Sequence, residues 1–467
     1  MMGKGSESSV DTFSRSHPEC PKCGLPTFVE GDGILFCASC EQTFDMKKDG
    51  LVPHVIEKRK GVRVLSIVIP VLLIIALLSV AVGILIYLGD DQEGRIDIYD
   101  VALVRDLEAE RDVPVDHMEP SMYDDYIQSN LDDQRRRELW ELERFYECML
   151  VMDPDWDLVS LVENSSSSNV LAFYETESER ITIIDDSNSE VYLNYILAHE
   201  LTHALQDQNF DLDGYYPTGS YDEDMARLCA VEGDAMFTME LWAEETLSVY
   251  DRLKLSREIM TETFRTDSYY DLESSNEVIS EMEYFPYLDG MNFVERIHAD
   301  YGYDGVNALF EGKPPLSTEQ VLHFEKYLEW EAPERIEMDL DEIGMDLAFE
   351  STAGEKLLTE LLSDLEGRIE GLEGNRTGIG WGGDRFVYLE NGSEFLSIFA
   401  IQWDTEEIND LFHFEYKEMV SWEGYDIPGD VTMVDGEYVK MVKEGRRTYV
   451  LRSDDLSLID DALPLLD

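Results

Sequence analysis

The longest uninterrupted apolar stretch of the chain runs from Val64 to Leu88 and contains no charged residue. A helix of this length crosses a bilayer with some tilt, whereas a buried core helix would carry polar positions. Basic residues precede the stretch, and Asp90, Asp91 and Glu93 follow it. Because positive charge stays on the cytoplasmic side, the pattern predicts a single-pass cell-membrane protein with a cytoplasmic N-terminus and an extracellular C-terminal part.

Polar positions dominate residues 1–16 and predict a flexible tail. The next segment, 17–47, holds two C-x-x-C pairs on either side of a strand-like stretch, Gly33 to Phe36. Such turns can direct four thiolates at one ion, so the segment resembles a zinc ribbon with a structural zinc on Cys20, Cys23, Cys37 and Cys40. A pair of disulfides is the alternative, which a reducing cytoplasm disfavours. The basic segment 48–63 then links the ribbon to the predicted transmembrane helix 64–88.

Helical and strand-like periodicities are both present from residue 95 onward. Apolar positions predict a short hairpin made of Val170–Tyr174 and Ile181–Ile184. The 3.6-residue period of Val191–Leu205 predicts a helix that begins near Ser187–Ser189, where capping residues lie. Helical patterns then dominate to about residue 370. We therefore expect an α+β protein whose first extracellular domain, 95–345, is mostly helical with a small sheet.

The pattern changes in the C-terminal region, 346–467, where antiparallel strands are expected. Phe386–Leu389 and Phe395–Gln402 flank an Asn391-Gly392 turn, a strong hairpin signal. A helix should begin at the capping run Asp404–Glu407 and continue through Met419. Val431–Leu451 predicts two or three further strands, with a turn at Asp435-Gly436.

The charge of the chain is strongly negative. The sequence contains 36 Lys and Arg residues and 101 Asp and Glu residues, which gives a formal net charge of −65. This excess disfavours nucleic acid as a partner of the extracellular part and suggests a solvated surface suited to a salty medium. The ribbon is small and has few basic residues, so we expect it to have an accessory role with a cytoplasmic partner that the sequence does not identify.

The predicted helix around residue 200 contains His199-Glu200-Leu201-Thr202-His203. Histidines at i and i+4 share one helix face, so both can bind one zinc ion, and Glu200 lies beside them. A zinc-bound water has a pKa near neutrality, and an adjacent carboxylate can accept its proton as it attacks a peptide carbonyl. These five residues therefore predict a hydrolytic zinc centre with Glu200 as general base.

The same pentapeptide occurs in thermolysin, and the chain resembles the gluzincins, whose third zinc ligand is a glutamate on a following helix. More closely, it resembles a family of secreted or membrane-tethered prokaryotic metallopeptidases over about residues 100–420, with the ribbon outside the match. The motifs that carry this resemblance are Ala198–Asp211, Val231–Ala235, Pro314–Tyr327 and Gly380–Arg385. The resemblance implies a zincin-type peptidase fold and a catalytic zinc, and it leaves the substrate undefined.

Glu232 is the expected third ligand. The Val231–Ala235 resemblance favours it, and the stretch Asp222–Trp242 has a helical pattern with Glu232 at its centre. Asp207 would lie about 12 Å along the helix from His199, too far for convergence on one ion. Asp234 lies about 200° further round the second helix, so only one of the two carboxylates can face the metal. Gly233 is expected to let the two helices approach closely.

Other roles are less well defined by the pattern. Thermolysin has an aspartate one turn after its third ligand, where this chain has Met236, so the group that orients His199 is open between Asp234 and Asp207. His323 is the first choice for the donor to the tetrahedral oxyanion, followed by Tyr215, Tyr216 and Tyr327; a helix start at Ser317 with His323 merely packed is the alternative.

The sequence thus predicts a membrane-anchored zinc peptidase that acts on proteins or peptides. The competing hypothesis is a non-catalytic zinc-binding surface module that binds a partner, for which a base beside the ligands has no use. The Gly380–Arg385 run fits either a substrate groove or a turn that enters a strand. Cys148 and Cys229, both beyond the predicted span, are expected either to form a disulfide or to be two free thiols.

Overall fold

The computed structural model describes residues 95–466, apart from 153–155, 164–169, 185–187, 270–276 and 369–379, and nearer the N-terminus only Lys22 and four strands. The chain divides into two compact units, Met1–Tyr87 and Leu88–Asp467. The described strands of the first unit form one antiparallel sheet in the order β1 (Phe28–Gly31), β2 (Ile34–Cys37), β3 (Gln42–Lys47) and β4 (Gly50–Pro53).

Strand β2 overlaps the strand that the sequence predicts between the two cysteine pairs. The predicted tail, the side chains of the four ribbon cysteines and the predicted span 64–88 lie outside what the structure describes. Within the described residues, no helix combines the length and the apolar character needed to cross a membrane.

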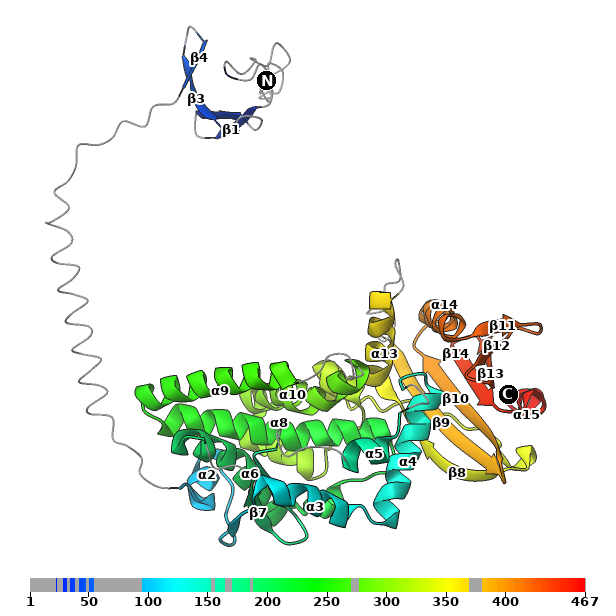
Figure 1. Cartoon of the computed structure of the whole chain (residues 1–467), viewed down its shortest axis with the longest axis horizontal. Helices are drawn as coiled ribbons and strands as arrows, with labels where there is room; N and C mark the ends of the chain where they lie inside the picture. The colour runs from blue at the N-terminus through cyan, green and yellow to red at the C-terminus, as the bar shows by residue number, and fades with distance from the viewer. Residues whose placement is uncertain are drawn as a thin grey trace, which may run out of the picture. The chain divides into compact units, whose positions relative to one another are not determined.

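The second unit contains both helices and sheets, as expected from the sequence, and its first half is mainly helical (Figure 1). Helix α8 (Tyr221–Thr246) packs along α10 (Glu277–Phe310) and against α6 (Glu190–Phe210), which in turn contacts α9 (Val249–Tyr269). The other helices of this half are α2 (Ile98–Arg105), α3 (Pro120–Asn130), α4 (Asp133–Cys148), α5 (Leu158–Glu163), α7 (Leu212–Tyr215), α11 (Thr318–Leu322) and α12 (Phe324–Glu329).

A small sheet lies beside α6. Its strands have the order β5 (Val115–His117), β7 (Arg180–Ile183) and β6 (Ala172–Glu175), with β5 parallel and β6 antiparallel to β7. The β6–β7 pair confirms the predicted hairpin. β6 is an edge strand of this sheet and packs against α6, the helix that carries the HExxH motif.

A seven-stranded antiparallel sheet forms most of the C-terminal region, at the opposite end of this unit from α2 (Figure 1). Its strands, in spatial order, are β11 (Tyr425–Ile427), β12 (Val431–Val434), β13 (Glu437–Glu444), β14 (Arg447–Ser453), β10 (Glu394–Trp403), β9 (Trp381–Asn391) and β8 (Asp346–Ser351). The helices here are α13 (Gly354–Arg368), α14 (Glu406–Glu423) and α15 (Leu456–Ala462), with short 3-10 turns at Asp341–Ile343 and Leu463–Leu465.

The predicted C-terminal elements are confirmed. β9 and β10 pair antiparallel around Asn391 and Gly392, and Thr405 caps α14 by accepting a hydrogen bond from the Ile408 amide. The predicted strands of 431–451 are β12, β13 and β14, with the turn at Asp435 and Gly436, both of which have positive φ.

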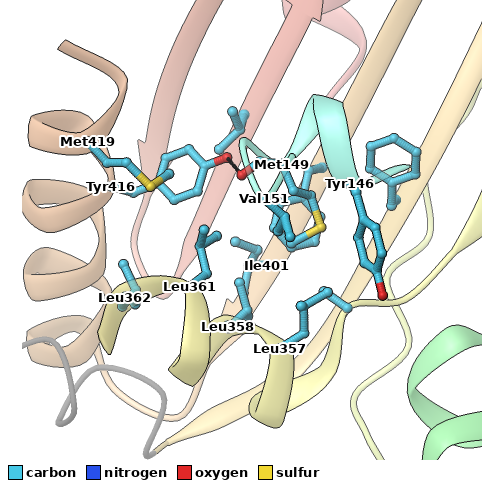
Figure 2. Close-up of a cluster of buried hydrophobic side chains, with 14 of the residues drawn as sticks. Tyr146, Met149, Val151, Leu357, Leu358, Leu361, Leu362, Ile401, Tyr416 and Met419 are labelled. Atoms are coloured by element: carbon cyan, nitrogen blue, oxygen red, sulfur yellow. Dashed lines mark hydrogen bonds between the residues drawn. The ribbon is translucent and has the colours of Figure 1, made fainter. Parts of the chain in front are cut away.

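A shared hydrophobic core joins this sheet to the helical half of the unit. Figure 2 shows Tyr146 and Met149 of the α4 end beside Leu357 of α13, Ile401 of β10 and Tyr416 of α14. The Tyr416 hydroxyl also donates a hydrogen bond to the Met149 carbonyl oxygen at 3.1 Å. Packing therefore continues across residue 345, and the domain boundary predicted there stays a prediction.

Cys148 and Cys229 lie in different cores. Cys148 packs against the core that surrounds the seven-stranded sheet, and Cys229 is buried in the core between α8 and α10. Both are free thiols in the structure, so of the two alternatives the structure shows the unpaired one.

Candidate metal centre

Helix α6 brings His199 and His203 onto one face. The helix begins where the sequence predicts, because the Ser189 side chain accepts a hydrogen bond from the Tyr192 amide and caps the first turn. Its apolar residues Leu197, Leu201 and Ala204 are buried in a core that also holds the small sheet. With that face fixed, the imidazole Nε2 atoms of the two histidines lie 3.0 Å apart.

Helix α8 supplies the third group. Glu232 Oε2 lies 3.2 Å from His199 Nε2 and 3.5 Å from His203 Nε2, and the three side chains are only 12–14% exposed. Among the described residues, these three form the one group of His, Cys, Asp or Glu side chains close enough to share an ion, with the ligand atoms within 4.8 Å of one another. The structure therefore brings together the three ligands that the sequence predicts.

A close helix crossing sets the position of Glu232. A Cβ atom on Gly233 would lie 2.3 Å from the Gly290 carbonyl of α10, and one on Gly290 would lie 2.5 Å from the Cys229 carbonyl oxygen of α8. The two backbones therefore touch at a point where no side chain fits. The expectation for Gly233 was wrong in one respect: Gly233 allows α8 to approach α10, whereas α6 contacts the neighbouring residues Val231, Glu232 and Asp234.

His203 and Glu232 each stabilise the charged form of the other. Burial lowers the pKa of His203, but the charge and hydrogen bond of Glu232, together with Glu200 and Gln206, outweigh burial and raise that pKa to about 9. Burial likewise raises the pKa of Glu232, yet the two imidazoles bring it far below its usual range. Glu232 is thus a carboxylate in a largely dry site, a state that only a neighbouring cation or proton donor stabilises.

Glu200 lies between the two histidines in sequence and is 8% exposed. Its carboxylate accepts a hydrogen bond of 2.9 Å from the Tyr174 amide of β6. The edge strand of the small sheet is therefore held directly beside the general base that the sequence predicts. The Tyr174 hydroxyl donates to Asp207 at 2.8 Å, so Asp207 fixes the β6 side of the site and does not reach the imidazoles in its described contacts.

Two tyrosines lie near the cluster. The Tyr287 ring of α10 stacks on the His199 ring, with centroids 6.3 Å apart, and its side chain is 38% exposed. Burial, then the charges of Glu232 and Glu200, raise the pKa of Tyr287 well above its usual value. Burial and the charge of Glu232 also raise the pKa of Tyr216, to about 12. Both phenols keep their protons at neutral pH and are available as O–H donors.

The other predicted donors engage different partners. His323 caps the end of α11, and its Nε2 lies 2.8 Å from Glu355 Oε1, so its described contacts do not include the three ligands. Ser317 caps α11 through the Gln320 amide, as the structural alternative for this segment requires. The Tyr215 hydroxyl donates to the Leu309 carbonyl and the Tyr327 hydroxyl to the Lys313 carbonyl.

The Gly380–Arg385 run has a structural role in the contacts described. Trp381 is buried at 1% exposure, and a Cβ on Gly383 (φ +154°) would lie 2.3 Å from the Glu334 carbonyl oxygen. The Asp384 carboxylate accepts hydrogen bonds from the amides of Ala353 and Gly354 at the start of α13 and from the Trp381 indole. The run also lines a cavity of about 660 Å³.

Comparisons of the chain with protein-family models, with curated proteins and with solved structures returned no match. The site is therefore defined by its geometry. Sequence reasoning missed Tyr287, which is 55 positions from Glu232 and belongs to no motif. It also passed over Gln206, although i+3 spacing from His203 could have suggested a contact.

Proposed function

We propose that the chain is a zinc metallopeptidase whose catalytic zinc is held by His199, His203 and Glu232. The observation that carries this proposal is the convergence of two imidazole Nε2 atoms and one carboxylate oxygen, separated by 3.0, 3.2 and 3.5 Å. Ligand atoms at about 2.1 Å from a tetrahedral zinc lie roughly 3.4 Å apart, so these spacings fit the ion. Glu232 Oε2 is buried without a well-aligned hydrogen-bond donor, which also fits a ligand atom.

Zinc, when bound, supplies a Lewis acid that makes a bound water acidic near neutral pH. Glu200 is the residue that accepts the proton of that water, because it is adjacent to His199 and is held by the β6 amide. The same carboxylate can then deliver the proton to the leaving amine. A purely structural zinc site gains nothing from such a base, and this favours a peptidase over a non-catalytic binding module.

The edge strand β6 suggests how a substrate lies in the site. β6 pairs with β7 on one side only among the described strands, and its Tyr174 amide already contacts Glu200. A peptide that added to the other edge would be held extended by main-chain hydrogen bonds next to the general base. We assign the oxyanion donor to Tyr287, whose phenol is partly exposed beside His199, in place of His323.

The proposed location follows from the sequence. The basic flank and acidic exit of 64–88 favour a membrane anchor with the peptidase outside the cell, and the cysteine pairs of 17–47 favour a second, structural zinc in a cytoplasmic ribbon. The net charge of −65 suits a domain exposed to a salty external medium.

The proposal is tested by hydrolysis of casein by the full-length protein, purified in detergent. Glu200→Gln should lower turnover at least about 10³-fold and keep the metal, since it removes the base and spares the ligands. Glu190→Gln, in the first turn of the same helix, is the matched control and should behave as wild type. If wild type binds zinc but does not hydrolyse casein, the non-catalytic module is the better account of the site; hydrolysis by Glu200→Gln at the wild-type rate would show that Glu200 is not the base.

A further inference from the structure

A fully buried glutamine contacts one of the proposed zinc ligands. Gln206 is 0% exposed and lies one turn beyond His203 on α6. Its Oε1 lies 2.9 Å from His203 Nδ1, the ring nitrogen that faces away from Glu232. Its Nε2 lies 2.9 Å from the Val231 carbonyl oxygen and 3.0 Å from Asp234 Oδ2, both on α8.

These contacts determine the orientation of the amide. A backbone carbonyl oxygen and a carboxylate only accept hydrogen bonds, so the group that faces Val231 and Asp234 must be the NH₂, which has two protons to donate. The amide oxygen therefore faces His203, and an oxygen only accepts. It follows that His203 carries its proton on Nδ1 when neutral, which leaves the Nε2 lone pair directed at His199 and Glu232.

Asp234 lies between the Gln206 amide and a buried cation, Arg105. Arg105 Nε lies 2.6 Å from Asp234 Oδ1, and both side chains are 0% exposed. The guanidinium is held in turn by Asn307 Oδ1 at 2.9 Å and by the Tyr303 ring, 4.9 Å from its centroid. A guanidinium only donates, so Asp234 has a donor on each side, Arg105 on one and the Gln206 amide on the other.

We propose that Gln206, Asp234 and Arg105 form a buried polar chain that fixes His203 in its Nδ1–H tautomer and so prepares Nε2 to bind zinc. Gln206 is the positioning residue of this polar chain. Arg105, at the opposite end, determines which groups of the polar chain donate and which accept hydrogen bonds. This inference rests on the proposed zinc site. It also makes α2, the helix at the start of the second unit, a part of the metal centre, although Arg105 lies far from the motif in sequence.

The experiment measures zinc affinity of the full-length protein by competition with a chromophoric chelator, together with the visible spectrum of the cobalt-substituted protein, which reports ligand geometry. The variants are Gln206→Met, which removes the acceptor at similar volume, and Gln206→Asn, which keeps an amide too short to bridge. Gln208→Met is the matched control, because Gln208 on the same helix bonds the backbone at Glu110 and Arg111 and does not touch the histidines.

We expect both Gln206 variants to weaken zinc binding about 10- to 100-fold and to change the cobalt spectrum, while Gln208→Met leaves both unchanged. Wild-type zinc affinity and an unaltered cobalt spectrum in either folded Gln206 variant would overturn the proposed polar chain. If Gln206→Met does not fold, the result for Gln206→Asn decides the question. A wild-type protein that binds no zinc at His199 and His203 would instead remove the proposed function itself, so the two failures are distinguishable.

Discussion

Gly233 of α8 lies directly against Gly290 of α10, so closely that a Cβ on Gly233 would be 2.3 Å from the Gly290 carbonyl. This contact connects the third ligand to the tyrosine beside the site, since Glu232 precedes Gly233 by one residue and Tyr287 precedes Gly290 by three. A side chain at the crossing must separate the helices. Such a side chain is therefore expected to affect both the stability of the protein and the proposed metal site.

Gly233→Ala should therefore destabilise the protein by about 3 kcal/mol and weaken zinc binding, because α8 moves away from α10 and carries Glu232 with it. Thermal unfolding with and without zinc measures both effects. Glu244→Ala, at an exposed position of the same helix, is the control for a simple helix substitution. An unchanged melting temperature for Gly233→Ala would mean that the crossing is looser than the structure shows.

Tyr287→Phe removes the proposed oxyanion donor and nothing else from the ring. Turnover should fall about 10²-fold with little change in KM or in zinc content, as is typical for loss of one such donor. Tyr301→Phe, an exposed tyrosine of the same helix, should retain full activity. If Tyr287→Phe is fully active and His323→Gln loses turnover with zinc retained, the donor is His323.

The His323–Glu355 pair predicts a pH dependence of stability. The hydrogen bond to Glu355 is the main cause that raises the pKa of His323, and burial opposes it; burial raises the pKa of Glu355. A folded-state pKa raised above the unfolded one gives stability that is complete below the ordinary histidine pKa, about 6.5, and is lost as pH rises through the raised value.

His323→Gln should accordingly lower the melting temperature more at pH 6 than at pH 9, because the stabilisation by the pair is lost as pH rises through the raised pKa of His323. Melting temperatures of wild type and variant across this range give the comparison, and Glu355→Gln should show the same trend. An equal difference at both pH values would contradict the assignment of the proton to this pair.

Two adjacent substitutions in the Gly380–Arg385 run distinguish a structural role of this segment from a role in a substrate groove. Asp384→Ala should destabilise the protein by about 3 kcal/mol, since three donors lose a buried acceptor. Arg385→Ala, which removes an ion pair with the half-exposed Glu350, should cost less than about 1 kcal/mol and leave KM unchanged. A raised KM in Arg385→Ala with normal stability would favour the groove.

Local signals predicted the elements of this fold well. Ser189 and Thr405 are capping residues at the starts of α6 and α14, and Asn391-Gly392 is a turn between two strands, all within short sequence windows. The proposed ligands were predictable partly for the same reason: i and i+4 spacing puts His199 and His203 on one face, and helix geometry lets only one of Glu232 and Asp234 face them. Backbone periodicity carries that information without reference to distant segments. The choice of Glu232 came from the Val231–Ala235 resemblance.

The remainder of the site depends on tertiary contacts that leave no local pattern. Tyr287 reaches His199 only because two glycines let α8 and α10 touch, and Arg105 reaches Asp234 from a helix more than a hundred positions earlier. His323 was selected for its chemistry within a motif, yet Glu355 holds its ring nitrogen. Residue type alone does not reveal which partner a buried polar group finds.

The most direct measurement of the central claim is zinc content by metal analysis, paired with casein hydrolysis, for full-length wild type, Glu232→Gln and Glu200→Gln. Wild type should hold one zinc in the ribbon and one at the catalytic site; Glu232→Gln should lose the second zinc and all turnover, and Glu200→Gln should keep both ions and lose turnover alone. Full metal content and activity in Glu232→Gln, with loss of both in Asp234→Asn, would contradict the account and assign the third ligand to Asp234.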